Sequence, residues 1–253
     1  INKALAVLKS LFGFLHQAAY LVNDVSALLQ IEQTRAAMVE RYLNAEHIRF
    51  IQQTLLSLPC EDATQMLRKT RLNWIFIFAI KTGLRLEELS QAHTGNLKKI
   101  DKHWYLLVSG KGRAENEHDL VAVTPELLQN LKEYRLLLGL NALPSQDEKT
   151  PLIGQVHRPS QAITSRALAL LFADIFAAAK QAAEHANLPD YAQLYANASP
   201  HWLRHSLGTL LVNNGMDLRN VAKIMRHRNI ATTMRYLHTE IHQLHDEIRD
   251  KGF

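Results

Sequence analysis

A nearly unbroken apolar run at residues 72–80 constrains this chain more than any other feature of its sequence. Such a run has to be buried, and the Thr82-Gly83 pair after it is typical of a helix end, because glycine adopts the left-handed conformation at little cost. We therefore predict a buried helix that stops at Gly83, with Arg85 beginning the next turn. The run is far shorter than the roughly 18 apolar residues that a membrane span needs. We expect no membrane segment.

Most of the remaining sequence has helical periodicity, and residues 97–123 are the exception. Residues 104–108 and 120–123 are β-like, with turns at Asp101-Lys102 and at Gly110-Lys111-Gly112, so a small antiparallel sheet is expected there. The predicted fold class is mainly α with a small antiparallel β-sheet (α+β). Helix starts are predicted from capping residues at Asn44, Thr124-Pro125, Thr164 or Ser165, Ser199-Pro200, Asp217 and Thr232-Thr233.

The polar stretch at residues 32–41 resembles a linker and divides the chain. We predict a boundary near residue 36, which separates residues 1–36 from a main domain of residues 37–238. Residues 239–253 form a predicted tail helix with Ile241, Leu244 and Ile248 on one face, and an isolated helix this short needs that face buried to be stable. The single cysteine, Cys60, excludes an internal disulfide, and no secretory segment is evident. We expect a cytoplasmic protein.

The net positive charge of this chain is concentrated in one segment. The formal net charge is +5, and the segment from His201 to Tyr236 accounts for all of it, because six basic residues there face one acidic residue, Asp217. A nucleic-acid partner requires such a concentration of positive charge, although a solvated basic face would look the same. The six are Arg204, Arg219, Lys223, Arg226, Arg228 and Arg235. We expect Arg226 and Arg228 to contact DNA.

Two arginines and a histidine have the chemistry of a phosphodiester site, and two of these three residues are spaced to share a helix face. His201 and Arg204 are three residues apart, so on a helix they share a face and can point at one anion. Breaking a phosphodiester adds negative charge to the phosphoryl oxygens, and two guanidinium groups can hold those oxygens with paired hydrogen bonds. We assign that role to Arg85 and Arg204.

Three further residues complete a candidate reaction. Tyr236 is the candidate nucleophile, because a phenol becomes effective once a neighbouring base such as His201 accepts its proton. His227 is a candidate hydrogen-bond donor to the phosphate. Lys111, in a glycine-flanked turn, is suited to protonate the leaving 5′ oxygen. This chemistry needs no metal and no nucleotide, so no cofactor is expected.

The ordered set of segments resembles the tyrosine recombinase family of phage integrases. The resemblance covers residues 38–238 and rests on Thr82-Gly83-Leu84-Arg85, the Gly110-Lys111-Gly112 turn, His201-Trp202-Leu203-Arg204, His227 and Tyr236. It implies the catalytic fold of that family and a site-specific recombinase that cleaves and rejoins double-stranded DNA through a 3′-phosphotyrosyl intermediate. It also implies a homo-oligomer on DNA, a tetramer, in which the tail is exchanged between protomers.

The resemblance adds supporting positions and has two departures. Glu88 matches an acidic position that supports the site, Arg166 lies at a helix start similar to one that faces DNA, and residues 1–36 look like the end of a helical core-binding domain. However, the family usually has Leu-Gly before the second histidine, whereas this chain has Met225-Arg226. Residues 189–198 also have no clear counterpart.

Several alternatives stay open. A type IB topoisomerase uses similar residues without strand exchange, and the helix pair at residues 200–226 could belong to a DNA-binding regulator without catalysis, although the intact Tyr236 argues against it. We interpret His205 and Trp202 as helix-packing residues. Three histidines of the tail could hold a metal on one helix face, but they lack a metalloprotease glutamate, and a solvated face is favoured. These are His238, His242 and His245.

Overall fold

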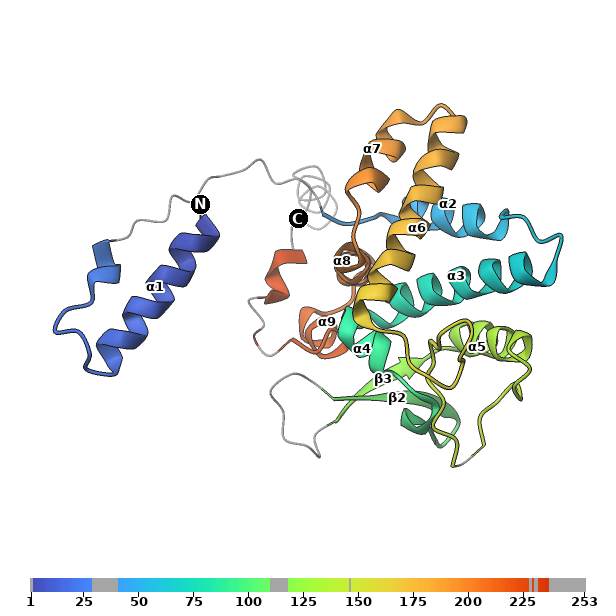
Figure 1. Ribbon diagram of the computed structural model, residues 1–253, viewed down its shortest axis with the longest axis horizontal. Coiled ribbons are helices and arrows are strands. Elements are labelled where there is room, and N and C mark those ends of the chain that lie inside the picture. The colour runs from blue at the N-terminus through green and yellow to red at the C-terminus, as the bar shows by residue number, and fades with distance from the viewer. Residues whose placement is uncertain are drawn as a thin grey trace, which may run out of the picture. The chain divides into compact units, whose positions relative to one another are not determined.

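The computed structural model describes residues 2–28, 41–109, 118–145, 147–227, 229 and 232–236. The chain divides into two compact units, residues 1–40 and 41–253. The first unit contains helix α1 (Asn2–Gln17) and the short 3-10 helix η1 (Val25–Leu28) (Figure 1). The predicted boundary at residue 36 and the predicted tail helix lie outside the described residues, and both stay predictions.

The second unit is mostly helical with one small sheet, which confirms the predicted fold class. Its strands β1 (Leu97–Ile100), β2 (His103–Ser109) and β3 (His118–Val123) form an antiparallel sheet in the order β1-β2-β3. Its helices are α2 (Ala45–Leu56), α3 (Ala63–Thr82), α4 (Leu86–Gln91), η2 (Thr94–Asn96), α5 (Pro125–Leu137), α6 (Ser165–His185), α7 (Pro189–Asn197), α8 (Pro200–Asn213), α9 (Leu218–Ile224) and η4 (Met234–Tyr236).

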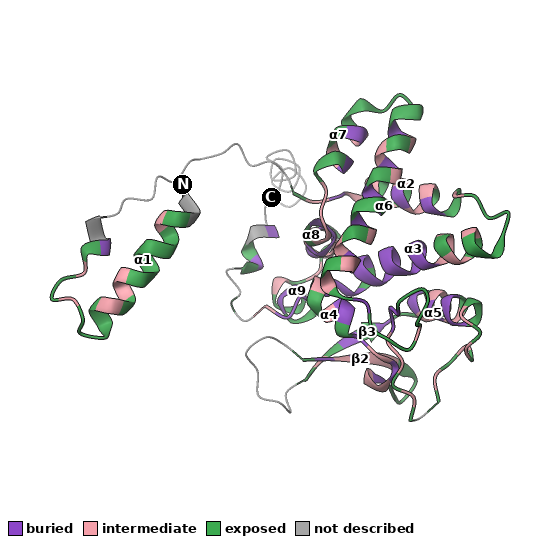
Figure 2. Ribbon diagram, in the orientation of Figure 1, coloured by how far each residue is buried: buried purple, intermediate pink, exposed green. Residues whose placement is uncertain are grey.

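Helix α3 is the centre of the second unit. Every residue from 71 to 80 is buried, and Figure 2 shows this stretch as the most continuously buried part of the ribbon. The helix contacts α2, α5, α6 and α8, and the Trp74 indole donates to the Leu152 carbonyl over 2.8 Å. It ends at Gly83, which has a left-handed φ of 57°. The predicted buried helix and its end are confirmed.

Local capping explains where the other helices begin. Asn44, Thr124, Thr164 and Asp217 each accept a hydrogen bond from a backbone N–H in the first turn of their helix, which satisfies donors that otherwise have no partner. Ser199 is the residue before α8, with Pro200 in its first turn. These starts agree with the predicted ones.

The sheet presents one apolar face to the core. In its register Leu106 on β2 lies between Leu97 on β1 and Val121 on β3, and all three side chains are buried. The β1–β2 turn contains Asp101 at a φ of 53°. The predicted sheet is therefore confirmed, while the Gly110-Lys111-Gly112 turn falls outside the described residues.

The segment at residues 189–198, which had no clear counterpart, contains α7 (Pro189–Asn197). This helix packs against α6, with Pro189 in its first turn. The buried Tyr195 of α7 donates its hydroxyl hydrogen to the His47 carbonyl over 3.0 Å and stacks on Phe50, so α7 is tied to α2 as well. The segment therefore has a packing role.

Candidate functional site

Arg85 and Glu88 form a rigid pair at the start of α4. The Arg85 backbone N–H donates to one carboxylate oxygen of Glu88 and the Arg85 guanidinium donates to the other, both over 2.8 Å. The Glu88 side chain is 9% exposed, whereas that of Arg85 is 47% exposed. Burial pushes the Glu88 pKa upward, but the Arg226 charge and the bonds from Arg85 outweigh it and hold this pKa below its usual value. Arg85 is thus anchored on one edge and open on the other.

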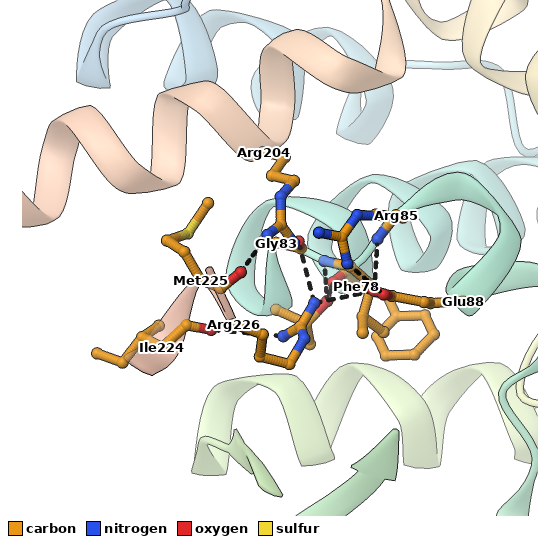
Figure 3. Close-up of polar contacts among 10 residues, drawn as sticks. Phe78, Gly83, Arg85, Glu88, Arg204, Ile224, Met225 and Arg226 are labelled. Carbon is orange, nitrogen blue, oxygen red and sulfur yellow. Dashed lines mark hydrogen bonds and ion pairs between the residues drawn. The ribbon is translucent and has the colours of Figure 1, made fainter. Parts of the chain in front are cut away.

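Arg204 joins three segments of the chain from its place on α8. Its guanidinium donates to the carbonyls of Gly83 and Met225 (Figure 3). Burial, followed by the charges of Arg226 and Arg85, lowers its pKa to about 10. Arg204 therefore stays protonated at neutral pH, and it holds the end of α3 next to the end of α9.

His201, in the first turn of α8, forms a pair with His205. Their Nε2 atoms are 2.8 Å apart, so one ring donates and the other accepts. Partial desolvation and the charges of Arg204 and Arg85 lower the His201 pKa. At neutral pH His201 is therefore uncharged and able to accept a proton, as its predicted role as a base requires.

A helix-end turn presents His227. Arg226 has a left-handed φ of 53°, and the N–H groups of Arg226 and His227 donate to the carbonyls of Lys223 and Ala222 over 3.0 and 2.9 Å. This is the paired bonding of a Schellman motif. Nδ1 of His227 lies 2.9 Å from Oγ1 of Thr233, which leaves Nε2 free of that contact. Desolvation and then the Arg204 and Arg85 charges lower the His227 pKa to about 4, so the ring is neutral.

Tyr236, on η4, lies against the surface of α8 beside His205 and His227. Its ring stacks on His227 with centroids 5.8 Å apart and meets His205 edge-on at 5.6 Å. The side chain is buried, and it fits because residue 208 is glycine. A Cβ there would lie 2.6 Å from two atoms of the Tyr236 ring.

The structure thus brings together five of the six predicted catalytic residues: Arg85, His201, Arg204, His227 and Tyr236. The sixth, Lys111, and the predicted DNA contact Arg228 lie outside the described residues. Arg166 is exposed in the first turn of α6, next to Ser165, whose hydroxyl is 3.0 Å from that of Ser90.

Arg226 was expected on the surface as a DNA contact, and the structure places it differently. Its side chain is 3% exposed and forms an ion pair with Glu88 over 2.9 Å. The left-handed turn described above places Arg226 so that its guanidinium reaches Glu88 and the Gly83 carbonyl. In this structure Arg226 is not a surface cation.

Sequence reasoning missed three residues that border Tyr236 or His227. His205 was interpreted as a packing residue, Thr233 only as part of a helix start, and Gly208 was not considered. A glycine inside a helix costs about 1 kcal/mol relative to alanine, so Gly208 was a signal that something approaches the α8 backbone closely. Nothing in the local sequence marks Thr233 as a partner of His227.

The described residues contain neither a metal-binding cluster nor a membrane-spanning helix. No three histidine, cysteine, aspartate or glutamate side chains of that part of the chain could hold a metal ion together. None of its helices is long and apolar enough to cross a membrane. The three tail histidines lie outside the described residues.

Comparison with known proteins identifies a family and several relatives of this chain. The phage integrase family matches residues 41–242. Tyrosine recombinase XerC of Lactobacillus delbrueckii subsp. bulgaricus is 29% identical over 98% of this chain and 75% of its own length. Tyrosine recombinase XerD of Brucella abortus is 25% identical over 96% and 72%.

Solved structures share the fold. The XerH site-specific recombinase bound to a palindromic difH substrate has a TM-score of 0.63 and 20% identity, with 87% of this chain and 56% of that chain covered. A lambda integrase dimer bound to a core site has a TM-score of 0.57 and 14% identity, with 92% and 70% covered. This chain thus spans a little over half of the XerH chain and about three quarters of its curated relatives. With the family match covering most of its length, the chain belongs to the phage integrase family of tyrosine recombinases.

Proposed function

We propose that this protein is a site-specific DNA recombinase that acts on double-stranded DNA without metal or nucleotide. The Tyr236 oxygen attacks a backbone phosphorus, the bond from phosphorus to the 5′ oxygen breaks, and a 3′-phosphotyrosyl link and a free 5′-hydroxyl result. Attack by the 5′-hydroxyl of a second strand reverses these bond changes and releases Tyr236. One ester replaces another at each step, so no external energy source is needed.

Each side chain has one role in this reaction. His201 accepts the phenol proton, and its neutral state at physiological pH supports that role. Arg85 and Arg204 bind the non-bridging oxygens, where charge develops in the transition state. His227 donates from Nε2; in that tautomer Nδ1 accepts from the Thr233 hydroxyl, which lies 2.9 Å away. Lys111 protonates the leaving oxygen.

The observation that carries the proposal is the convergence around Tyr236. Its ring contacts His227 and His205, His205 is bonded to His201, and Arg204 in the same helix reaches the Gly83 carbonyl beside Arg85. A nucleophile, three imidazoles and two arginines therefore share one location, although they come from three distant parts of the chain.

We also propose that the protein works as a homo-tetramer on DNA and is cytoplasmic. The tail at residues 239–253 would dock on a neighbouring protomer through Ile241, Leu244 and Ile248, because a head-to-tail exchange of this kind closes into a ring. Arg166 and Arg228 would contact the DNA backbone.

A covalent-trapping selection tests the function. The protein is incubated with a pool of duplexes of random sequence that carry a nick close to the cleavage position, so that cleavage releases a short fragment and traps the adduct. We expect adducts that survive denaturing detergent, enriched in one sequence, and strand exchange between duplexes that carry it. Absence of any adduct would contradict the proposal. Adducts accompanied by relaxation of supercoiled DNA, but without strand exchange, would favour a type IB topoisomerase.

A further inference from the structure

Arg226 occupies a backbone position that does not suit it. It lies at the left-handed residue of the turn that ends α9, where a side chain with a Cβ is less favourable than glycine. Asn187, at the end of α6, has the same place in an equivalent turn, with a φ of 55°, but asparagine tolerates this conformation well. An arginine at this position is therefore expected to have a compensating role.

The compensation is visible in the contacts of its guanidinium. Nη2 of Arg226 lies 2.9 Å from one carboxylate oxygen of Glu88 and 3.4 Å from the Gly83 carbonyl, as Figure 3 shows. Glu88 is 138 residues away in sequence. The side chain therefore joins the turn that presents His227 to the segment that presents Arg85.

The two arginines divide the Glu88 carboxylate between them. One oxygen accepts from the Arg85 guanidinium, and the other accepts from the Arg85 backbone and from Arg226. With Arg226 in place the carboxylate cannot rotate without breaking an ion pair that is almost fully buried. The open edge of Arg85 is thereby held in one direction.

The charges around this carboxylate agree with such a division. Arg85, Arg204 and Arg226 surround Glu88. After burial, the charges of Arg226 and Arg85 are the next largest causes that lower the pKa of Arg204. Pairing Arg226 with Glu88 cancels one positive charge and leaves two guanidinium groups to meet a phosphodiester anion. Burial lowers the pKa of Arg226, while Glu88 and, less strongly, Asp119 of β3 favour its charged form.

We propose that Arg226 is a positioning residue, which orients Arg85 through Glu88 and does not itself contact DNA. This inference rests on the proposed function, since its effect is measured on DNA cleavage. It predicts a loss in the rate of cleavage with little loss in DNA affinity.

The test compares Arg226→Gly with wild type on the nicked duplex that wild type cleaves best. We expect single-turnover cleavage at saturating protein to slow about tenfold, the coupling expected of residues joined by a buried ion pair, while the Kd for the duplex stays within about twofold. Arg226→Lys should recover most of the rate. Asn187→Gly is the matched control, because it makes the same backbone change at the end of α6, and it should cleave like wild type.

A double-mutant cycle tests whether Glu88 transmits the effect. In a Glu88→Gln background, Arg226→Gly should slow cleavage by less than about twofold, because the partner is already altered. Independent effects in this cycle, or an unchanged rate in the single variant, would overturn the proposal. So would a weaker Kd with a smaller salt dependence, because that result identifies a phosphate contact.

The design separates failure of this inference from failure of the proposed function. If wild type forms no adduct with any duplex, the function fails. If wild type reacts and the cycle gives independent effects, only the inference fails. Arg226→Gln, which keeps a long polar side chain, replaces Arg226→Gly in the cycle if circular dichroism shows that the glycine variant is unfolded.

Discussion

Replacing Gly208 with alanine should disable cleavage while leaving the fold largely intact. The added Cβ would lie 2.6 Å from two ring atoms of Tyr236, whereas carbon atoms in ordinary contact are about 3.5–4.0 Å apart. The ring therefore has to retreat by about 1 Å, and a misplacement of that size at a reacting group costs on the order of 100-fold in rate. We expect the single-turnover cleavage rate to fall by that factor.

The stability effect of the same variant is small because two contributions oppose each other. Alanine in a helix interior is favoured over glycine by about 1 kcal/mol, while overpacking costs about 1–3 kcal/mol. The free energy of unfolding, measured with urea, should fall by about 0–2 kcal/mol. Thr209→Ala, one residue further along α8, is the control for a substitution in this helix.

Two outcomes would refute this reasoning. A folded Gly208→Ala protein that cleaves within about twofold of wild type would mean that the ring position on α8 is irrelevant to the reaction. Faster cleavage would mean that Tyr236 has to leave this position before it reacts.

Three further predictions concern other parts of the site. The folded pKa of His227 is about 4 against an ordinary 6.5, so between these pH values the unfolded chain binds a proton that the folded chain does not. The free energy of unfolding should therefore fall as pH drops from 6.5 to 4, by about 1–2 kcal/mol more in wild type than in His227→Gln once partial solvent exposure is allowed for. Parallel pH curves for the two proteins would contradict this. Lys111→Ala should slow cleavage strongly on normal DNA but much less where the 5′ bridging oxygen is replaced by sulfur, since a thiolate leaves without a proton. The sulfur substrate should not rescue variants of Arg85 or Arg204. Equal slowing of Lys111→Ala on both substrates would exclude Lys111 as the general acid. Deleting the residues after Thr239 should impair cooperative assembly on DNA, seen by gel shift, more than the first cleavage, and an unchanged assembly would exclude tail exchange.

Features set by neighbours in sequence could be predicted well. The apolar run before Gly83, the caps at Asn44 and Thr124, and the alternation around Leu106 each specify local structure through burial or backbone hydrogen bonds. The spacing of His201 and Arg204 likewise predicted a shared face of one helix.

Features set by distant contacts could not be predicted from local patterns. The ion pair between Arg226 and Glu88 depends on how α9 ends near α4, and the charge of Arg226 alone indicated a surface cation. The packing of the Tyr236 ring against Gly208 depends on the path of the chain after α9. The assignment of Arg85 and Arg204 to one site rested on their shared chemistry and on the resemblance to a family, because no periodicity connects residues so far apart.

The central claim is that Tyr236 is the nucleophile, and the most direct test is the covalent adduct of Tyr236→Phe on the nicked duplex. The hydroxyl takes part in the chemistry but adds little to an interface dominated by phosphate contacts. We therefore predict that the variant forms no adduct, while its Kd for the duplex stays within about twofold of wild type. An adduct formed at the normal rate by Tyr236→Phe would contradict the account.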